Sequence, residues 1–77
     1  MSKTEYAWVI QRDDGEYFTF SEFNYDGIPQ GIFFTKYIHL AYLEEKELLE
    51  HYIKRLDLQN CVPVKVKIEI VGEDYGN

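Results

Sequence analysis

The first quarter of the chain consists of short apolar runs separated by turn residues, a pattern typical of a β-hairpin. A first strand is expected over Tyr6–Gln11, with apolar side chains on both of its faces. Residues 12–16 contain two aspartates and a glycine and predict the turn, because glycine accepts a positive φ and aspartate bonds to nearby backbone. A second strand over Tyr17–Phe23 places Phe18 and Phe20 on one face, which we expect to cover the core.

The next stretch breaks this regular pattern. Residues 24–31 contain two glycines and a proline and predict an irregular loop, since glycine frees the backbone and Pro29 stops a β-ladder. A short third strand is expected over Ile32–Thr35. It has no clean alternation, so it fits either a strand covered on both faces or one packed under the helix that follows.

The clearest local pattern predicts an amphipathic α-helix from Glu44 to Leu56. Apolar residues recur there at spacings of one, three and four, with acids toward the start and bases toward the end, as the helix macrodipole favours. Residues 38–43 fit either an extra turn in register with this helix or a separate short turn before it. The apolar stripe consists of Leu48, Leu49, Tyr52, Ile53 and Leu56.

A last strand is expected over Val62–Val71, where branched apolar residues alternate with mostly charged ones. The charged positions should face water, as in a sheet covered on one side only. The order of elements predicts an α+β fold: a small, mainly antiparallel sheet of three to four strands with one amphipathic helix on one face. We expect a single domain over residues 1–77, with residues 1–4 and 72–77 flexible.

The expected strand and helix differ in length. Ten strand residues span roughly 33 Å, whereas thirteen helical residues cover about 20 Å. Part of the strand should therefore overhang, and the aromatic residues on both faces of the hairpin add apolar surface that one short helix cannot cover. We expect a partner to cover the rest.

The cysteine content and hydropathy of the 77 residues narrow the class of protein. Cys61 is the single cysteine, which excludes an internal disulfide and a cysteine zinc cage and fits a reducing, cytoplasmic setting. No apolar run approaches the roughly 18 to 20 residues that a spanning helix needs. We therefore expect no membrane association.

The residues that usually carry catalysis form no recognisable motif. His39 and His51 are twelve residues apart, and neither makes a recognisable nucleophile and base pair with Cys61. The spacing of acids does not fit a calcium loop, and Gly27 and Gly31 lack the lysine of a phosphate-binding loop. We expect a non-enzymatic protein that uses no cofactor and no metal.

Charge points toward a protein partner. Eight basic and fourteen acidic residues give a net charge of −6, so the 17% of aromatic residues are not expected to stack on nucleic acid, which needs cations at its phosphates. The same charge favours a host protein with a basic surface, although acidic surfaces also serve solubility alone. The candidate partner-binding residues are the aromatic anchors Tyr6, Trp8, Tyr17 and Tyr25 and the acids Asp13, Asp14, Glu16 and Asp26.

The order of these features resembles that of short uncharacterised proteins encoded by phages and prophages of Gram-positive bacteria. The resemblance implies a viral context in which small acidic proteins are frequently inhibitors of host machinery, including anti-CRISPR and other anti-defence proteins. It assigns no catalytic or binding residue. The resemblance is carried by Trp8 to Ile10, the turn at Asp14 and Gly15, Phe18, the glycines before Ile32 and Phe33, Ala41 with Leu43, Glu44 to Glu47, and Val64 to Val66.

Three functions follow from these expectations. The leading one is a phage-encoded, protein-binding inhibitor of a host defence or nucleic-acid-binding protein, acting by steric or acidic, nucleic-acid-mimicking occlusion. One alternative is a homo-oligomeric structural or regulatory phage protein in which the sheets of two copies meet as a homodimer. The other is a sponge that sandwiches a nucleotide signal between aromatic rings of two protomers.

Overall fold

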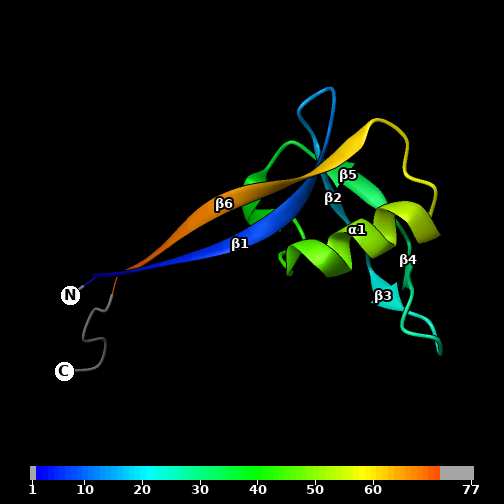
Figure 1. Ribbon diagram of the computed structural model, residues 1–77, viewed down its shortest axis with the longest axis horizontal. Helices are drawn as coiled ribbons and strands as arrows, with labels where there is room; N and C mark the ends of the chain where they lie inside the picture. The colour runs from blue at the N-terminus through cyan, green and yellow to red at the C-terminus, as the bar shows by residue number, and fades with distance from the viewer. Residues whose placement is uncertain (1, 72–77) are drawn as a thin grey trace.

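The structure, a computed structural model, describes residues 2–71 of the 77-residue chain. The α+β prediction is confirmed: one helix packs against a mainly antiparallel four-stranded sheet, and a small two-stranded ladder lies beside it (Figure 1). None of the helices in this part of the chain is long and apolar enough to cross a membrane. In chain order the elements are β1 Ser2–Arg12, β2 Tyr17–Thr19, β3 Glu22–Phe23, β4 Pro29–Gln30, β5 Phe33–Thr35, the 3-10 turn η1 Ile38–Leu40, α1 Lys46–Arg55 and β6 Cys61–Val71.

The large sheet has the strand order β5-β2-β1-β6, so β5 and β6 are its edges. The predicted hairpin between the first two strands is confirmed by the pairing of Gln11 with Tyr17. β1 and β6 come from opposite ends of the chain and pair along their whole length, from Arg12 opposite Cys61 onward. This ladder is the longest strand pairing among the described residues.

The core lies between α1 and one face of the sheet. The predicted stripe is confirmed, because Leu49 and Tyr52 of α1 are buried against Ile10 of β1 and Phe18 of β2. Phe20 packs against this cluster as expected, and so do the other members of the helical stripe. Few apolar side chains are fully enclosed in the described residues, which is what a chain this short permits.

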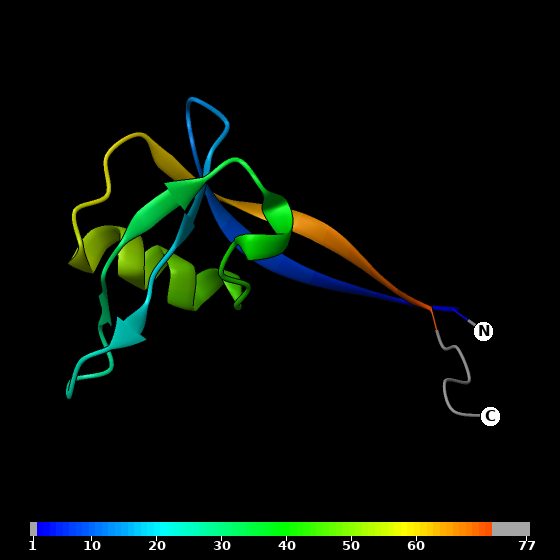
Figure 2. The same ribbon diagram turned by 180° about the vertical axis from the view of Figure 1, so that it is seen from behind.

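The opposite face of the sheet is also partly covered. Val9 points to that side and is fully buried, and η1 crosses the sheet there, on the side away from α1 (Figure 2). Ile38 of η1 and Leu43 line a hollow of about 270 Å³ together with Val66 and Ile68 of β6. The expectation of a sheet covered on one side only is therefore wrong.

The helix begins later than predicted. α1 starts at Lys46, and Glu44, the expected first residue, forms an antiparallel bridge with Trp8 of β1. In this bridge each backbone N–H donates to the carbonyl oxygen of the other residue at 3.1 Å. Because the bridge holds the chain extended, η1 is a separate short turn, the second of the two alternatives for residues 38–43.

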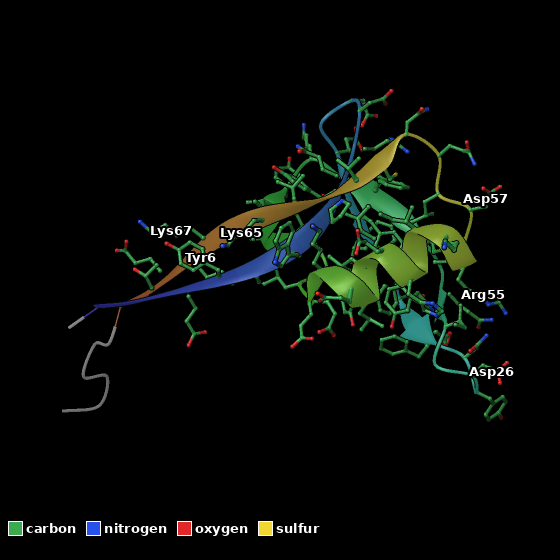
Figure 3. The ribbon with its side chains drawn as sticks, in the orientation of Figure 1. Tyr6, Asp26, Arg55, Asp57, Lys65 and Lys67 are labelled. Atoms are coloured by element: carbon green, nitrogen blue, oxygen red, sulfur yellow. The ribbon has the colours of Figure 1, made fainter. Side chains whose placement is uncertain are left out.

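The last strand forms as predicted, but its apolar side faces away from the helix. The register places Lys65 opposite Trp8 and Lys67 opposite Tyr6, and residues paired across an antiparallel ladder share a face. Both lysines are exposed, as expected, yet they lie on the helix side of the sheet, past the start of α1 (Figure 3). Val62, Val64 and Val66 alternate onto the other face.

The predicted overhang is present. Residues 2–7 of β1 and 66–71 of β6 project as a two-stranded ribbon, here called the arm, away from the rest of the sheet and from α1 (Figure 1). The arm gives the molecule a longest dimension of 46 Å. Residues 2–4, expected to be flexible, belong to β1, because β6 supplies a pairing partner for each of them. The tail at 72–77 lies outside the described residues.

The second strand and the loop after it differ from their predictions. β2 ends at Thr19, and the chain turns before β3, so Tyr17–Phe23 is not one strand. The expected loop at residues 24–31 contains β4, in which Pro29 pairs with Phe23. Proline is tolerated because this ladder has only two strands, so each of its strands is an edge.

Candidate functional site

The eight candidate partner-binding residues do not form one surface. Tyr6 lies on the arm and Asp26 lies at the other end of the long axis, as Figure 3 shows. Asp13, Asp14 and Glu16 occupy the turn between β1 and β2, a third location. We therefore consider each location separately.

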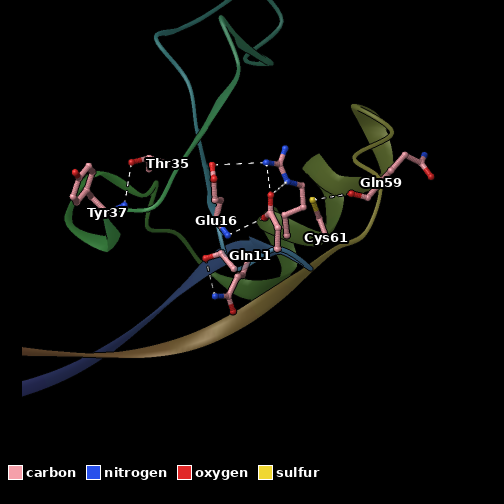
Figure 4. A network of polar contacts seen from close by, with 9 residues as sticks. Gln11, Glu16, Thr35, Tyr37, Gln59 and Cys61 are labelled. Atoms are coloured by element: carbon pink, nitrogen blue, oxygen red, sulfur yellow. Dashed lines mark hydrogen bonds and ion pairs between the residues drawn. The ribbon is translucent and has the colours of Figure 1, made fainter.

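In the hairpin turn, the side chain of Arg12 contacts two of the predicted acids. The Arg12 guanidinium donates to Asp14 Oδ2 at 2.7 Å from one amino nitrogen and at 3.1 Å from Nε, and lies 3.7 Å from Glu16 Oε1 (Figure 4). Asp14 also accepts from the backbone N–H of Glu16 at 3.0 Å. These bonds hold the pKa of Asp14 below its ordinary value, the arginine contributing most. One guanidinium against three carboxylates leaves the turn with a net negative charge, but Asp14 and Glu16 are already engaged within the chain.

The tip of the β3–β4 hairpin carries Tyr25 and Asp26. Asn24 Oδ1 accepts from the backbone N–H groups of Asp26 at 2.8 Å and Ile28 at 2.9 Å, and this local bonding shapes the turn. The Tyr25 ring is fully exposed. Of the predicted residues this hairpin carries one ring and one carboxylate, beside the exposed Glu22 and Phe23 of β3.

Tyr17 is half-buried in β2 and contributes to neither of these sites. It pairs with Gln11 and with Thr35 in the middle of the sheet. The register places its side chain on the η1 side, away from Trp8, Phe18 and α1. It is thus separated from the other aromatic anchors.

Tyr6 and Trp8 are brought together with acids that the sequence pattern did not single out. A groove of about 510 Å³, here called the arm groove, runs between the free edge of β1 and the start of α1. Trp8 packs against the core, while the Tyr6 ring is 62% exposed. Because the groove follows a strand edge, side chains from both faces of β1 line it. Its apolar lining consists of Tyr6, Ala7, Trp8, Leu43 and Ile68.

Four carboxylates and one ammonium group complete the lining of the arm groove. The carboxylates belong to Glu5 on the arm and to Glu44, Glu45 and Glu47 around the start of α1. The ammonium group is that of Lys46, whose Nζ lies 5.1 Å from the centre of the Trp8 ring. The groove therefore combines aromatic surface with a clear excess of negative charge.

The Glu44 carboxylate makes two hydrogen bonds at the edge of the groove. Its Oε2 accepts from the hydroxyl of Tyr42 and its Oε1 accepts from the backbone N–H of Glu45, both at 3.0 Å. Burial, followed by the hydrogen bond to Glu44, raises the pKa of Tyr42, so the phenol stays a donor. The carboxylate is thereby held at the groove while its backbone pairs with Trp8.

The remaining nucleophilic and metal-binding residue types form no second site in the described residues. No cluster of three or more histidine, cysteine, aspartate or glutamate side chains there could hold a metal ion. The Cys61 thiol donates to the carbonyl oxygen of Gln59 at 3.2 Å, and burial raises its pKa (Figure 4). A protonated, half-buried thiol is a poor nucleophile.

The sequence pattern places Glu44, Glu45 and Glu47 only at the start of a helix, where they complement the macrodipole. What brings them to Tyr6 and Trp8 is the bridge between Trp8 and Glu44, a pairing over thirty-six positions. A local pattern carries no sign of such a pairing. One usable signal was the run of three glutamates within four residues directly after Leu43.

Comparisons of the chain with protein-family models, with curated proteins and with solved structures found no match. The resemblance to short phage proteins therefore stays a prediction. The chemistry of the arm groove is the strongest available guide to function, because it joins two of the predicted anchors to four acids.

Proposed function

We propose that this protein is a non-enzymatic, protein-binding inhibitor that docks on a basic surface of its target through the arm groove. The observation that carries the proposal is the juxtaposition of Tyr6 and Trp8 with the carboxylates of Glu44, Glu45 and Glu47. Aromatic side chains supply contact area at low entropic cost, and an acidic rim favours encounter with a positive surface.

The two aromatic rings of the groove already attract cations within the chain. Lys46 Nζ lies over Trp8, and Lys65 Nζ lies 4.7 Å from the centre of the Tyr6 ring. Such cation–π contacts are worth about 0.5–1 kcal/mol at exposed sites and more when desolvated. Lysine and arginine side chains of a partner fit the same ring faces and the neighbouring carboxylates.

The expected target is a host protein whose positive surface normally receives nucleic acid, such as a defence nuclease or another nucleic-acid-binding protein. The phage resemblance supports this context, and an anti-CRISPR or other anti-defence role is its most specific form. Occupation of that surface by an acidic protein would exclude nucleic acid sterically and by charge.

Affinity capture with a matched pair of variants tests the proposal. The wild-type protein and the double variant Glu45→Gln and Glu47→Gln are immobilised and exposed to a Gram-positive lysate at low and high salt. We expect wild type to retain a basic protein at low salt, and the variant and high salt to reduce that retention. The captured protein should then lose bound nucleic acid when wild type is added.

Asp26→Asn and Glu22→Gln serve as the control pair, because they remove the same charge far from the arm groove. Capture that is equal for wild type and for the groove variant would contradict the proposal. Recovery of no basic protein at low salt would contradict it too.

A second candidate function, a homodimer, is favoured by the apolar surface on the η1 side of the sheet. Ile38, Leu40, Leu43 and Val62 are each at least 44% exposed. Positions 62, 64, 66 and 68 of β6 alternate onto this face and carry no charge. Two copies of an acidic chain would repel least through such a face.

Light scattering of wild type and of Leu40→Glu tests the dimer. A dimer through the η1 side predicts twice the chain mass for wild type at high micromolar concentration, and a monomer for Leu40→Glu. Tyr25→Glu, a change at the distant hairpin tip, should leave the dimer intact. A wild-type monomer at the highest concentration would exclude this function.

A further inference from the structure

The free edge of β1 in the arm groove offers backbone hydrogen-bonding groups to a partner. Trp8 turns both its N–H and its C=O toward Glu44. In an antiparallel ladder these directions alternate, so Ala7 and Val9 pair with β6, while Tyr6 points its backbone groups to the same side as Trp8. The chain leaves this edge at Glu45 to enter α1, and Tyr6 has no backbone partner within residues 2–71.

We propose that an extended, lysine- or arginine-rich peptide segment of the partner adds to the free edge of β1 as a further strand, directly beyond Glu44. This inference rests on the proposed function and specifies the form of the ligand. Glu44 already occupies this edge through its pairing with Trp8, just after Tyr42, which donates its backbone N–H to Phe18 of β2. The incoming strand continues that line along the arm, opposite Tyr6.

The pairing geometry fixes which side chains of the added strand meet the acids. A residue paired with Tyr6 through backbone hydrogen bonds places its side chain on the face of Tyr6 and Trp8, which is the face of α1. Glu44 lies on this face by its pairing with Trp8, and Glu47 lies in the first turn of α1. Basic residues at alternate positions of the peptide therefore face these carboxylates.

The two edges of the β1–β6 ladder differ in how they suit an added strand. On the outer edge of β6, Pro63 lacks an N–H, and Lys65 and Lys67 would repel a basic segment. On the β1 edge, glutamates line the groove and every residue from 2 to 12 has an N–H. Charge and hydrogen-bonding capacity both direct a basic strand to β1.

Synthetic peptides with alternating lysine and threonine, blocked at both ends, test the pairing. Trp8 is the only tryptophan of the chain, so its fluorescence reports directly on the arm groove. Three peptides of identical charge are titrated: one unmodified, one N-methylated at every threonine, and one N-methylated at every lysine. N-methylation removes the backbone donor and leaves the side chains unchanged.

The unmodified and threonine-methylated peptides are expected to bind within about twofold of each other, because the threonine N–H groups point away from β1. The lysine-methylated peptide is expected to bind at least about tenfold more weakly, since it loses the bonds to β1 or must turn its lysines to the wrong face. Glu47→Gln should weaken binding of the unmodified peptide about two- to fivefold, and Asp26→Asn should leave it unchanged.

Equal binding of all three peptides, with a response of Trp8, would overturn strand addition and leave groove docking intact. Weakening by both patterns of methylation, or no binding by any peptide at low salt, would also overturn strand addition. The proposed function is judged separately, by whether the groove glutamates are needed to capture a basic protein. The two failures are therefore distinguishable.

Discussion

At the scale of single residues, Arg12 links the charge of the hairpin turn to the packing of the sheet. Its guanidinium binds Asp14 and approaches Glu16, and its central carbon lies 4.1 Å from the centre of the Phe34 ring. The stacking fixes the guanidinium where both carboxylates can reach it. Two acids that composition alone assigned to a partner are thus engaged within the chain.

We predict that Asp14→Asn destabilises the fold slightly at neutral pH and not in strong acid. The folded state lowers the pKa of Asp14 from its ordinary 3.8. Its contribution is therefore present above that value and is lost as pH falls through the folded pKa. Urea unfolding of wild type and variant at several pH values measures the difference, and a difference that persists unchanged in strong acid would contradict the contact with Arg12.

Among the described glycines, Gly31 is the one whose replacement should cost most. Its φ is 68°, and an added Cβ would collide with the Ser21 hydroxyl, which donates to the carbonyl oxygen of Gln30 at 3.2 Å. Gly27 has a similar φ of 75° but open space around it.

We predict that Gly27→Ala costs about 1–2 kcal/mol of unfolding free energy through backbone strain, and that Gly31→Ala costs clearly more. Chemical denaturation of both variants measures this. Equal costs would show that Ser21 moves aside freely.

At the scale of elements, the β1–β6 ladder decides where the functional side chains lie. Its register places Lys65 and Lys67 on the helix side, opposite Trp8 and Tyr6. Trp8 directs its backbone groups to Glu44 and therefore away from β6. Because these directions alternate along an antiparallel ladder, the backbone N–H of Val66 points toward β1 and that of Lys67 points outward.

A pair of proline substitutions tests this alternation. Val66→Pro removes a donor inside the ladder and is expected to lower the free energy of unfolding by about 1–3 kcal/mol or more. Lys67→Pro removes an outward N–H, as Pro63 does naturally, and is expected to cost much less. Thermal unfolding of the two variants measures both losses of stability. A larger loss for Lys67→Pro than for Val66→Pro would show that the N–H of Lys67, and not that of Val66, points toward β1.

The elements themselves were predictable where a pattern was local. The stripe through Leu49 and Tyr52 predicted the helix, and the alternation in residues 62–71 predicted β6. Alternation shows which residues share a face, but not which face meets the helix, because that depends on a register with β1 set far along the chain. The break after Thr19 and the β3–β4 hairpin depend on local turn bonding, such as that of Asn24. The pattern of hydrophobic and polar residues does not show such bonding, so it did not predict these two features.

The candidate site was predictable only in part, for the same reason. The aromatic character of Tyr6 and Trp8 predicts them as candidate anchors, and the structure places both in the arm groove. The acids beside them were not predicted, because Glu44 reaches Trp8 through a bridge that no short window of sequence contains. The predicted acids Asp13, Asp14 and Glu16 share one turn instead, where Arg12 already binds two of them.

At the scale of the whole molecule, charge and apolar surface are separated. The arm groove on the side of α1 collects carboxylates around two rings, while the η1 side exposes aliphatic side chains such as Leu40 and Val62. A chain with a net charge of −6 thus has one surface suited to a basic partner and another suited to an uncharged one.

Lys46 should moderate the affinity of the arm groove. Among the described residues that line the groove it is the one cation, and its Nζ lies over the ring of Trp8. We predict that Lys46→Gln tightens binding of a basic partner about two- to fivefold and makes it more sensitive to salt. Titrations of wild type and variant at two salt concentrations measure both effects. Weaker binding by Lys46→Gln would contradict the prediction and show that Lys46 contributes to contact with the partner.

The most direct test of the arm groove as the binding surface is an amide chemical-shift map of the isotope-labelled protein on addition of a captured basic partner or a lysine-rich peptide. We predict the largest shifts at Thr4 to Trp8 and at Glu44 to Glu47, with the amides of Asn24 to Gly27 and of Val62 and Val64 nearly unmoved. Shifts concentrated on the η1 side or at the hairpin tip, with the groove unmoved, would contradict the account.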